Sequence, residues 1–264
     1  MGTKERLFFG ILSLLFIISY LVLFVFNPEM INSLTAEDHL YENAQAVCFL
    51  VTSIVFFILF LKDKSGNEFH VIQTRKNIFF LIFALLFFFG FGEEISWGQR
   101  IFYWRPPGWL TTMNVQGEAN IHNLNWFNWI DAQGNLKSFW ARMLDFNRIY
   151  SIFYFTYCFL IPILDKINIR FHRWIRRLNL PIVPIWMGVL LPLNYLIYKI
   201  IELYFTNSHW RTQSEIKESV SSILFVGISI WFLRNPNKMR ADLRLLPNHS
   251  SRSNQAISPS ADRN

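Results

Sequence analysis

The sequence predicts an all-α, polytopic membrane protein with about six transmembrane helices and a Trp-rich outer loop between the third and fourth. Two observations lead to this prediction. Hydrophobic residues make up 52% of the 264-residue chain and aromatic residues 18%, including 28 Phe and 10 Trp, whereas a soluble domain needs a more polar surface. The apolar residues also come in runs of roughly 20, the length of helix that crosses a bilayer core.

Six apolar runs follow one another along the chain. The first is too long for the core of a signal peptide and no small-residue cleavage site follows it, so we expect it to remain as a membrane anchor. The fifth contains Pro184 and Pro192, which a span tolerates as kinks when neighbouring helices satisfy the freed carbonyl groups. The predicted spans are residues 7–26, 44–61, 78–97, 149–164, 182–205 and 216–233.

The composition indicates one membrane domain, residues 1–247, followed by a disordered tail. Residues 248–264 are rich in Ser and Asn and have almost nothing apolar to bury. Cys48 and Cys158 both lie inside apolar runs, which predicts buried thiols and not a disulfide scaffold or a Cys-based zinc site. No P-loop is present, which argues against an ATP-driven machine in this chain.

Lys and Arg are concentrated in alternate connections between the predicted spans. They are frequent after the second span, after the fourth and after the sixth, and they are missing from the connection after the first. Because cytoplasmic loops carry an excess of Lys and Arg, this asymmetry predicts that both termini are cytoplasmic. The formal net charge of +7 is then explained by membrane topology, and we expect no nucleic-acid partner.

On this topology nearly all carboxylates outside the cytoplasmic connections lie on the outer side. The densest stretch is GEEISWGQR at residues 92–100. If the third helix continues through it, Glu93, Trp97 and Arg100 share one face. The adjacent carboxylates of Glu93 and Glu94 need a compensating charge near the interface, from Arg100 or from a metal ion. The alternative is a structural Glu–Arg pair that ties two helix ends together.

The outer loop contains a second polar stretch, NVQGEANIHN at residues 114–123. Read as a helix, it places Glu118 and His122 on one face, a spacing that suits a metal site or an acid/base pair. An adjacent amide-rich stripe, typical of binding to sugar or phosphate oxygens, is formed by Gln116, Asn120 and Asn123. A single Glu-x-x-x-His is a weak motif. The neighbouring Trp residues are equally typical of an aromatic belt at the membrane interface.

Acidic residues also begin two of the predicted spans. Asp38 and Glu42 precede the second span, and Glu215 and Glu218 begin the sixth. The helix dipole favours acidic residues in first turns, so each pair taken alone has an ordinary explanation. Their position on the same predicted side as the two polar stretches favours one shared site.

These segments resemble an uncharacterised family of bacterial multi-pass inner-membrane proteins. The resemblance covers residues 36–125 and the start of the last span, through the segments AEDHLYENAQAV, GEEISWGQRIF, NVQGEANIHN and SEIKES. It implies a location in the bacterial inner membrane and an outer-face site built from these polar groups. It implies no particular reaction.

The leading hypothesis is therefore a membrane-embedded hydrolase or transferase that acts at the outer leaflet on a lipid or lipid-linked substrate. The candidate catalytic residues are Glu93, Glu94, Glu118 and His122. The candidate substrate-binding residues are Gln99, Arg100, Gln116, Asn120 and Asn123, with Arg100 as a phosphate contact. A divalent metal ion is a further hypothesis, with the ligands Glu42, Glu93, Glu118 and His122.

Two alternatives remain. Glu93, Glu94 and Glu202 at membrane depth, with Lys199 on the proline-containing fifth span, are also typical of a small-cation or proton-coupled transporter. The Trp-rich loop is also typical of the docking surface of a non-catalytic assembly partner. An enzyme needs its carboxylates in one outer cavity, whereas a transporter needs polar groups toward the cytoplasmic side. The spans contain few such groups, which favours the enzyme.

Overall fold

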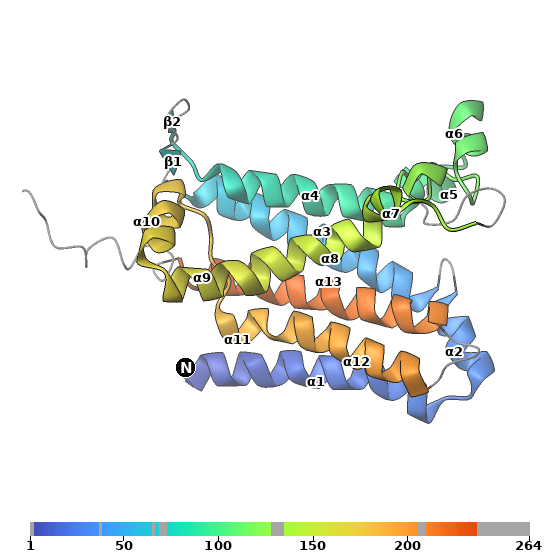
Figure 1. Ribbon diagram of the computed structural model, residues 1–264, viewed down its shortest axis with the longest axis horizontal. Helices are drawn as coiled ribbons and strands as arrows, with labels where there is room; N and C mark the ends of the chain where they lie inside the picture. The colour runs from blue at the N-terminus through green and yellow to red at the C-terminus, as the bar shows by residue number, and fades with distance from the viewer. Residues whose placement is uncertain are drawn as a thin grey trace, which may run out of the picture.

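The computed structural model describes residues 3–36, 39–64, 67–68, 73–127, 135–204 and 210–236. Glu37, Asp38 and the predicted disordered tail lie outside these ranges. Within them the chain is almost entirely helical, and regular strands are limited to one antiparallel pair, β1 (Asn67–Glu68) and β2 (Gln73–Thr74). The predicted fold class, an all-α polytopic protein, is confirmed (Figure 1).

Five helical segments in the described part of the chain are long and apolar enough to cross a membrane. They correspond to the predicted first, second, fourth, fifth and sixth spans. The first is α1 (Thr3–Val25), the second contains α2 (Pro28–Thr35) and α3 (Leu40–Lys62), and the last is α13 (Trp210–Arg234). The side chain of Asn27 caps α2 by accepting a hydrogen bond from the Met30 N–H at 2.8 Å.

The predicted third span is α4 (Ile78–Glu94), which packs in the bundle but is shorter than α1, α3 and α13. Its 17 residues extend over about 25 Å at a rise of 1.5 Å per residue, slightly less than the roughly 30 Å of a bilayer core. It packs along α3 through aromatic rings, and the rings of Phe56 and Phe87 lie 5.9 Å apart with only 12° between their planes. The bundle therefore contains α4 as a short sixth member.

The predicted fourth span is an interrupted helix. It consists of α8 (Phe146–Tyr154), a π-helical segment (Phe155–Leu160) and α9 (Ile161–Ile167). The π-helical segment is buried at Tyr157, whose hydroxyl donates a hydrogen bond to the carbonyl oxygen of Pro181 at 2.8 Å. This contact joins the fourth span to the segment that leads into the fifth.

The predicted fifth span begins with a short helix, α11 (Ile185–Gly188), and continues as α12 (Leu190–Tyr204). The expectation that Pro184 and Pro192 kink one continuous helix is only partly right. Pro184 is the residue before α11, and Pro192 lies in the first turn of α12. Proline is well tolerated at both positions because the first turn of a helix has no intrahelical partner for its N–H groups.

The two ends of the bundle differ in charge and in loop structure (Figure 1). One end carries the start of α1, the β1–β2 pair and α10 (Ile169–Leu178), a helix with the exposed cations Arg170, Arg173 and Arg177. We call this the basic end. The opposite end carries α2, α5 (Gln99–Phe102), α6 (Gly108–Met113) and α7 (Phe139–Met143). We call it the acidic end, because the carboxylates described below lie there.

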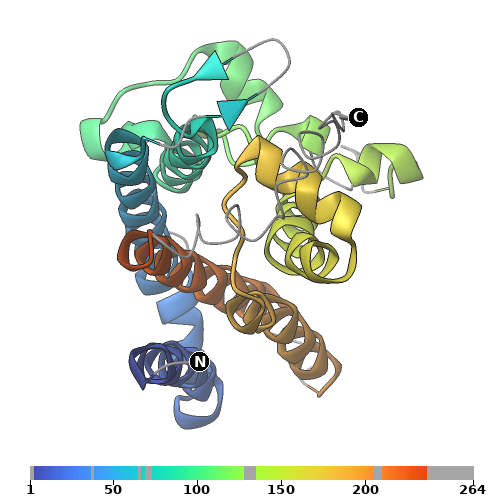
Figure 2. The ribbon, with the colours of Figure 1, turned by 90° about the vertical axis from the view of Figure 1, so that its left-hand side faces the viewer.

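The core is aromatic and lies where α3, α4 and α13 meet. Figure 2 views the bundle from the basic end and shows α3 and α13 side by side, with α4 next to α3. Phe56, Phe80, Phe225 and Phe232 are each at most 1% exposed. Burial of such large rings supplies most of the packing energy of a helix bundle. The aromatic core thereby fixes the positions from which α3, α4 and α13 extend toward the acidic end.

Candidate functional site

α4 ends at Glu94, and the chain then reverses direction. Ser96, Trp97 and Gly98 all have positive φ angles, of 46°, 52° and 76°. The expectation that a helix continues through residues 92–100 is therefore wrong, because successive left-handed residues cannot belong to a right-handed helix. Gly98 favours this break, since glycine adopts positive φ without steric cost.

The reversal folds the indole of Trp97 back over Gly92. A Cβ atom built on Gly92 would lie 2.8 Å from the Trp97 ring, so only glycine leaves space for it. In this position the Trp97 indole N–H donates a hydrogen bond to Oε1 of Glu93 at 2.7 Å. The predicted proximity of Glu93 and Trp97 is thus present, although the helix that was expected to produce it is absent.

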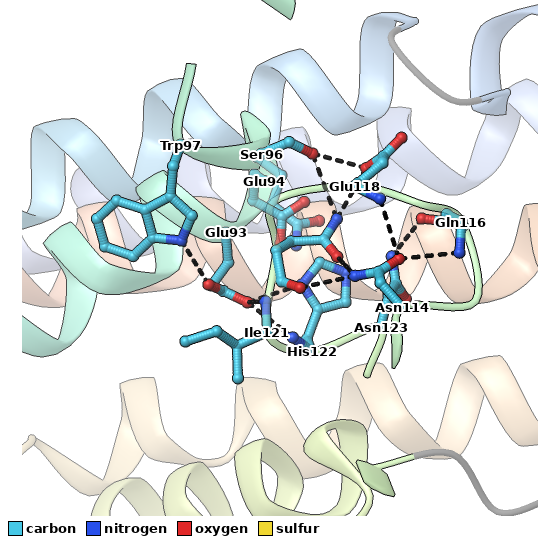
Figure 3. A network of polar contacts seen from close by, with 12 residues as sticks. Glu93, Glu94, Ser96, Trp97, Asn114, Gln116, Glu118, Ile121, His122 and Asn123 are labelled. Carbon is cyan, nitrogen blue, oxygen red and sulfur yellow. Dashed lines mark hydrogen bonds and ion pairs between the residues drawn. The ribbon is translucent and has the colours of Figure 1, made fainter. Parts of the chain in front are cut away.

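Glu93 connects α4 to the outer loop (Figure 3). Its Oε2 atom accepts hydrogen bonds from the backbone N–H groups of Ile121 and His122, at 2.6 and 2.8 Å. The His122 side chain lies against the same oxygen, with Nδ1 at 3.3 Å. The Glu93 side chain is only 4% exposed. A buried carboxylate with this many donors is held in one orientation.

The loop that carries His122 is not the helix that was expected for residues 114–123. Asn114 forms an isolated antiparallel bridge with Leu124, and Gly117 has a φ angle of 69°. The Asn114 side chain accepts from the N–H groups of Gln116 and Glu118 and donates to the backbone oxygen of Asn120. Asx side chains stabilise such turns because they replace backbone partners. Glu118 and His122 therefore occupy one site without sharing a helix face.

Glu118 is held by the chain reversal after α4. Its Oε2 atom accepts hydrogen bonds from the Ser96 hydroxyl at 2.6 Å and from the Asn120 amide at 2.8 Å (Figure 3). Asn123 donates to the amide oxygen of Gln116. These contacts join the two polar stretches that the sequence singled out into one network.

Glu94, the next residue of α4, is hydrogen-bonded to α3. Its Oε1 atom accepts a hydrogen bond from Gln45 Nε2 at 2.8 Å. The negative charges of Glu218, Glu215 and Glu42 repel a negative charge on Glu94. Glu218 is compensated in part by the neighbouring Lys217 ammonium, whose Nζ lies 3.2 Å from its Oε1 atom.

These groups surround one cavity of about 450 Å³ at the acidic end. Its polar part is lined by carboxylates, amides and the His122 ring, and its apolar part by side chains of α3, α4 and α8. The polar lining consists of Glu42, Gln45, Glu93, Glu94, Gln116, Glu118, Asn120, His122, Asn123, Asp145, Ser214, Glu215 and Glu218. Phe49, Phe87 and Phe153 are among the apolar residues that line it.

The structure thus brings most of the residues singled out in the sequence to one place, and their roles stay predictions. The Gln99 side chain contacts the backbone of the outer loop, where it accepts a hydrogen bond from the Ala119 N–H at 2.7 Å. The Arg100 side chain lies outside the described part of the structure, so the Glu93–Arg100 pair remains a hypothesis. Glu202 lies outside the cavity and pairs with Lys199, with 2.6 Å between Nζ and Oε2.

Sequence reasoning did not single out Gln45, Asp145 and Tyr150, which also line the cavity. Gln45 follows Glu42 by three positions, so helical spacing alone places both on one face of α3. Asp145 was missed because it is the N-cap of α8, where it accepts from the Arg148 N–H at 3.1 Å. Tyr150 lies within an apolar run, and no feature of the sequence separates it from ordinary core aromatics.

The predicted metal ligands do not form a coordination set. In the described ranges no three His, Cys, Asp or Glu side chains are close enough to hold a metal ion together. Glu93 and Glu118 instead direct their oxygens at N–H and O–H donors of the protein. Donors in these positions occupy the lone pairs that a cation would need.

Comparison with known proteins adds no family assignment. No protein-family model, no curated protein and no solved structure matches the chain. The resemblance to bacterial multi-pass inner-membrane proteins stays an expectation from the sequence.

Proposed function

We propose that the protein is a membrane-embedded hydrolase or transferase that acts on a lipid or lipid-linked substrate. The contact between His122 Nδ1 and Glu93 Oε2, at the edge of a cavity of about 450 Å³, is the observation that carries this proposal. In the proposed reaction His122 is the general base and general acid. Glu93 is a positioning residue that orients its ring.

The proposed chemistry follows from the two nitrogens of the imidazole. When Nδ1–H donates to Glu93, the other nitrogen, Nε2, carries a free lone pair. His122 lines the cavity and its side chain is 32% exposed, so this lone pair is accessible to a bound substrate. Nε2 takes the proton of an attacking hydroxyl, from water in a hydrolase or from an acceptor in a transferase. The same proton then passes to the leaving oxygen as its bond to the acyl or phosphoryl group breaks.

The apolar part of the cavity supports a lipid as the substrate. Leu86 of α4 and Ile149 of α8 line the cavity and are 41% and 42% exposed. Exposed apolar side chains on membrane-spanning helices contact hydrocarbon chains. A substrate with an acyl or prenyl chain therefore has a continuous apolar path from the bilayer to the polar groups around His122.

The proposed location is the bacterial inner membrane, with both termini in the cytoplasm. Apolar helices make the chain a membrane protein, and the cationic residues of α10 lie at the basic end together with the start of α1. Under the positive-inside rule this end is cytoplasmic. The cavity then opens at the outer leaflet.

A cation or proton-coupled transporter is a second candidate because the cavity is rich in carboxylates. The route from the cavity toward the basic end argues against it. There the core is formed by Phe56, Phe80, Phe83 and Phe232, which are at most 5% exposed. Packed aromatic rings offer no ligands to a dehydrated ion. A flux of protons or alkali cations into proteoliposomes, abolished by Glu94→Gln, would favour the transporter.

The enzyme proposal is tested by comparing lipid extracts of cells that lack the protein with extracts of cells that produce wild type, His122→Ala or His172→Ala. His172 is the matched control, because it pairs with Asp165 at 3.0 Å and lies on α10 at the basic end. We expect one lipid species to change when the protein is absent and wild type and His172→Ala to restore it. A His122→Ala strain with the wild-type lipid profile would overturn the proposal.

A further inference from the structure

We infer that the cavity binds a cationic amphiphile with a protonated amine in its headgroup, placed among the carboxylates, and a hydrocarbon chain placed among the aromatic side chains. This inference rests on the proposed function, because it names the substrate class of the same site. It replaces the expectation, drawn from the sequence, that the headgroup is recognised as a phosphate through Arg100.

The charge of the lining is the first observation. Seven carboxylates line the cavity: Glu42, Glu93, Glu94, Glu118, Asp145, Glu215 and Glu218. Among the described lining residues there is no Lys or Arg. The Lys217 ammonium beside Glu218 compensates one of the seven carboxylates. Such a lining attracts a cation and repels a phosphate.

Two buried acceptors without partners are the second observation. The Gln45 side chain is 4% exposed, and its Oε1 atom has no hydrogen-bond partner among the described residues. Its Nε2 atom donates to Oε1 of Glu94 at 2.8 Å, so the amide oxygen is the atom of Gln45 that is left without a partner. The hydroxyl oxygen of Tyr150 is likewise buried and without a partner in the described part of the chain.

The missing partner of Gln45 Oε1 is necessarily a hydrogen-bond donor. A carbonyl oxygen accepts and never donates, whereas a protonated amine has donors and no acceptor. A primary or secondary ammonium group beside this pair donates to Gln45 Oε1 and places its charge next to Glu94. A quaternary ammonium group carries the charge but no N–H, so it leaves Gln45 unsatisfied.

The aromatic lining is the third observation. Phe127 and Phe146 lie at the polar part of the cavity, with ring centroids 4.8 Å apart and nearly perpendicular planes. Faces of aromatic rings attract cations. Phe49 and Phe87, 5.9 Å apart, line the deeper part together with Phe153, which suits a hydrocarbon chain. The cavity thus has its charged groups at one part and its apolar surface at the other, which matches an amine headgroup followed by one hydrocarbon chain.

The test is equilibrium binding to the purified full-length chain in a neutral maltoside detergent. Radiolabelled dodecylamine is the probe, and dodecyl phosphate and dodecyltrimethylammonium are the competitors. We expect saturable binding of dodecylamine, strong competition by unlabelled dodecylamine, weaker competition by dodecyltrimethylammonium and none by dodecyl phosphate. Competition by dodecyl phosphate as strong as by dodecylamine would overturn the inference, because it would show that the hydrocarbon chain of the probe determines binding and its amine does not.

Variants locate the binding in the cavity. Glu94→Gln and Gln45→Leu should each weaken binding by about tenfold, the size of one charge-assisted hydrogen bond. Glu29→Gln is the matched control, because Glu29 is exposed on α2 and does not line the cavity. Elution as a single species on size exclusion shows which variants are folded, and Glu42→Gln replaces any that are not. Wild-type affinity in the folded variants would contradict the inference.

The same assay separates this inference from the proposed function. His122→Ala removes the proposed general base but no carboxylate, so we expect it to bind dodecylamine as wild type does. If His122→Ala binds the amine but its strain has the wild-type lipid profile, the ligand class stands and the enzyme proposal fails. If the His122→Ala strain has the lipid profile of cells that lack the protein, but no variant of the lining alters amine binding, the enzyme proposal stands and the ligand class is wrong.

Discussion

Nδ1 of His122 lies 3.3 Å from Oε2 of Glu93, although 29 positions separate the two residues in the chain. The backbone N–H groups of Ile121 and His122 converge on the same oxygen. Glu93 therefore does two things at once. It holds the outer loop on the end of α4, and it orients the ring that the proposed reaction uses.

Replacing Glu93 with Gln should lower the thermal stability of the protein. The amide oxygen of Gln can replace only one of the two carboxylate oxygens, so its NH2 group would face either the Trp97 indole N–H or the N–H groups of Ile121 and His122, which are themselves donors. Each buried donor left without an acceptor costs about 1–3 kcal/mol. The midpoint of thermal unfolding, followed by Trp fluorescence in detergent, should fall for Glu93→Gln and stay unchanged for the exposed control Glu29→Gln. Equal midpoints for Glu93→Gln and wild type would show that the network does not stabilise the fold.

Gly92→Ala should displace the Trp97 indole. A Cβ atom there would lie 2.8 Å from the ring, so the ring has to move away from Glu93. We expect a loss of about 1–3 kcal/mol in stability, as is typical when a group is forced into a packed position. Gly108→Ala is the matched control, because nothing lies within 4 Å of a Cβ atom at Gly108.

A double-mutant cycle makes this expectation specific. In a Trp97→Phe background the indole N–H is already lost and the ring is smaller, so Gly92→Ala should cost less than it does in wild type. Additive effects of the two substitutions on the unfolding midpoint would refute the proposed contact.

Asn194→Ala should destabilise the junction of α1, α12 and α13. The Asn194 side chain accepts from the Tyr20 hydroxyl at 2.6 Å and donates to the Lys217 carbonyl and the Ser221 hydroxyl at 2.8 and 2.9 Å. Its removal leaves the buried Tyr20 hydroxyl with only the more distant backbone oxygen of residue 194, at 3.4 Å, and loss of the shorter hydrogen bond costs about 1–3 kcal/mol. Adding Tyr20→Phe should recover part of the loss in unfolding midpoint. No recovery would mean that the two side chains are not coupled.

Reporter fusions test the proposed topology. Fusions after Lys64 and after Arg177 should report cytoplasm, because both positions lie at the basic end. A fusion near Asn135 should report the outside, since the loop before α7 lies at the acidic end. An alkaline phosphatase and a fluorescent protein, which are active on opposite sides of an inner membrane, give complementary signals. Reversed signals at two of the three positions would overturn the topology.

The residues themselves determined the architecture. Long apolar runs predict helical spans because lipid cannot form hydrogen bonds with backbone N–H and C=O groups. An α-helix pairs these groups within the same segment. The positions of Glu42, Glu93, Glu118 and His122 relative to those runs are enough to place all four at one end of the bundle. Since successive spans cross the membrane in opposite directions, the common end follows from counting spans.

Only the tertiary structure decided how these residues meet. The break after Glu94 depends on Trp97 packing over Gly92, and the turn of residues 114–124 depends on Asn114 replacing backbone partners. Spacing rules assume regular helices, so they predicted that Glu118 and His122 share a helix face, whereas residues 114–124 form a turn. The inclusion of Gln45 and Tyr150 in the lining was decided by packing of α3 and α8 around the cavity. Contacts between residues far apart in the chain depend on how whole helices pack, which no local pattern of residues specifies.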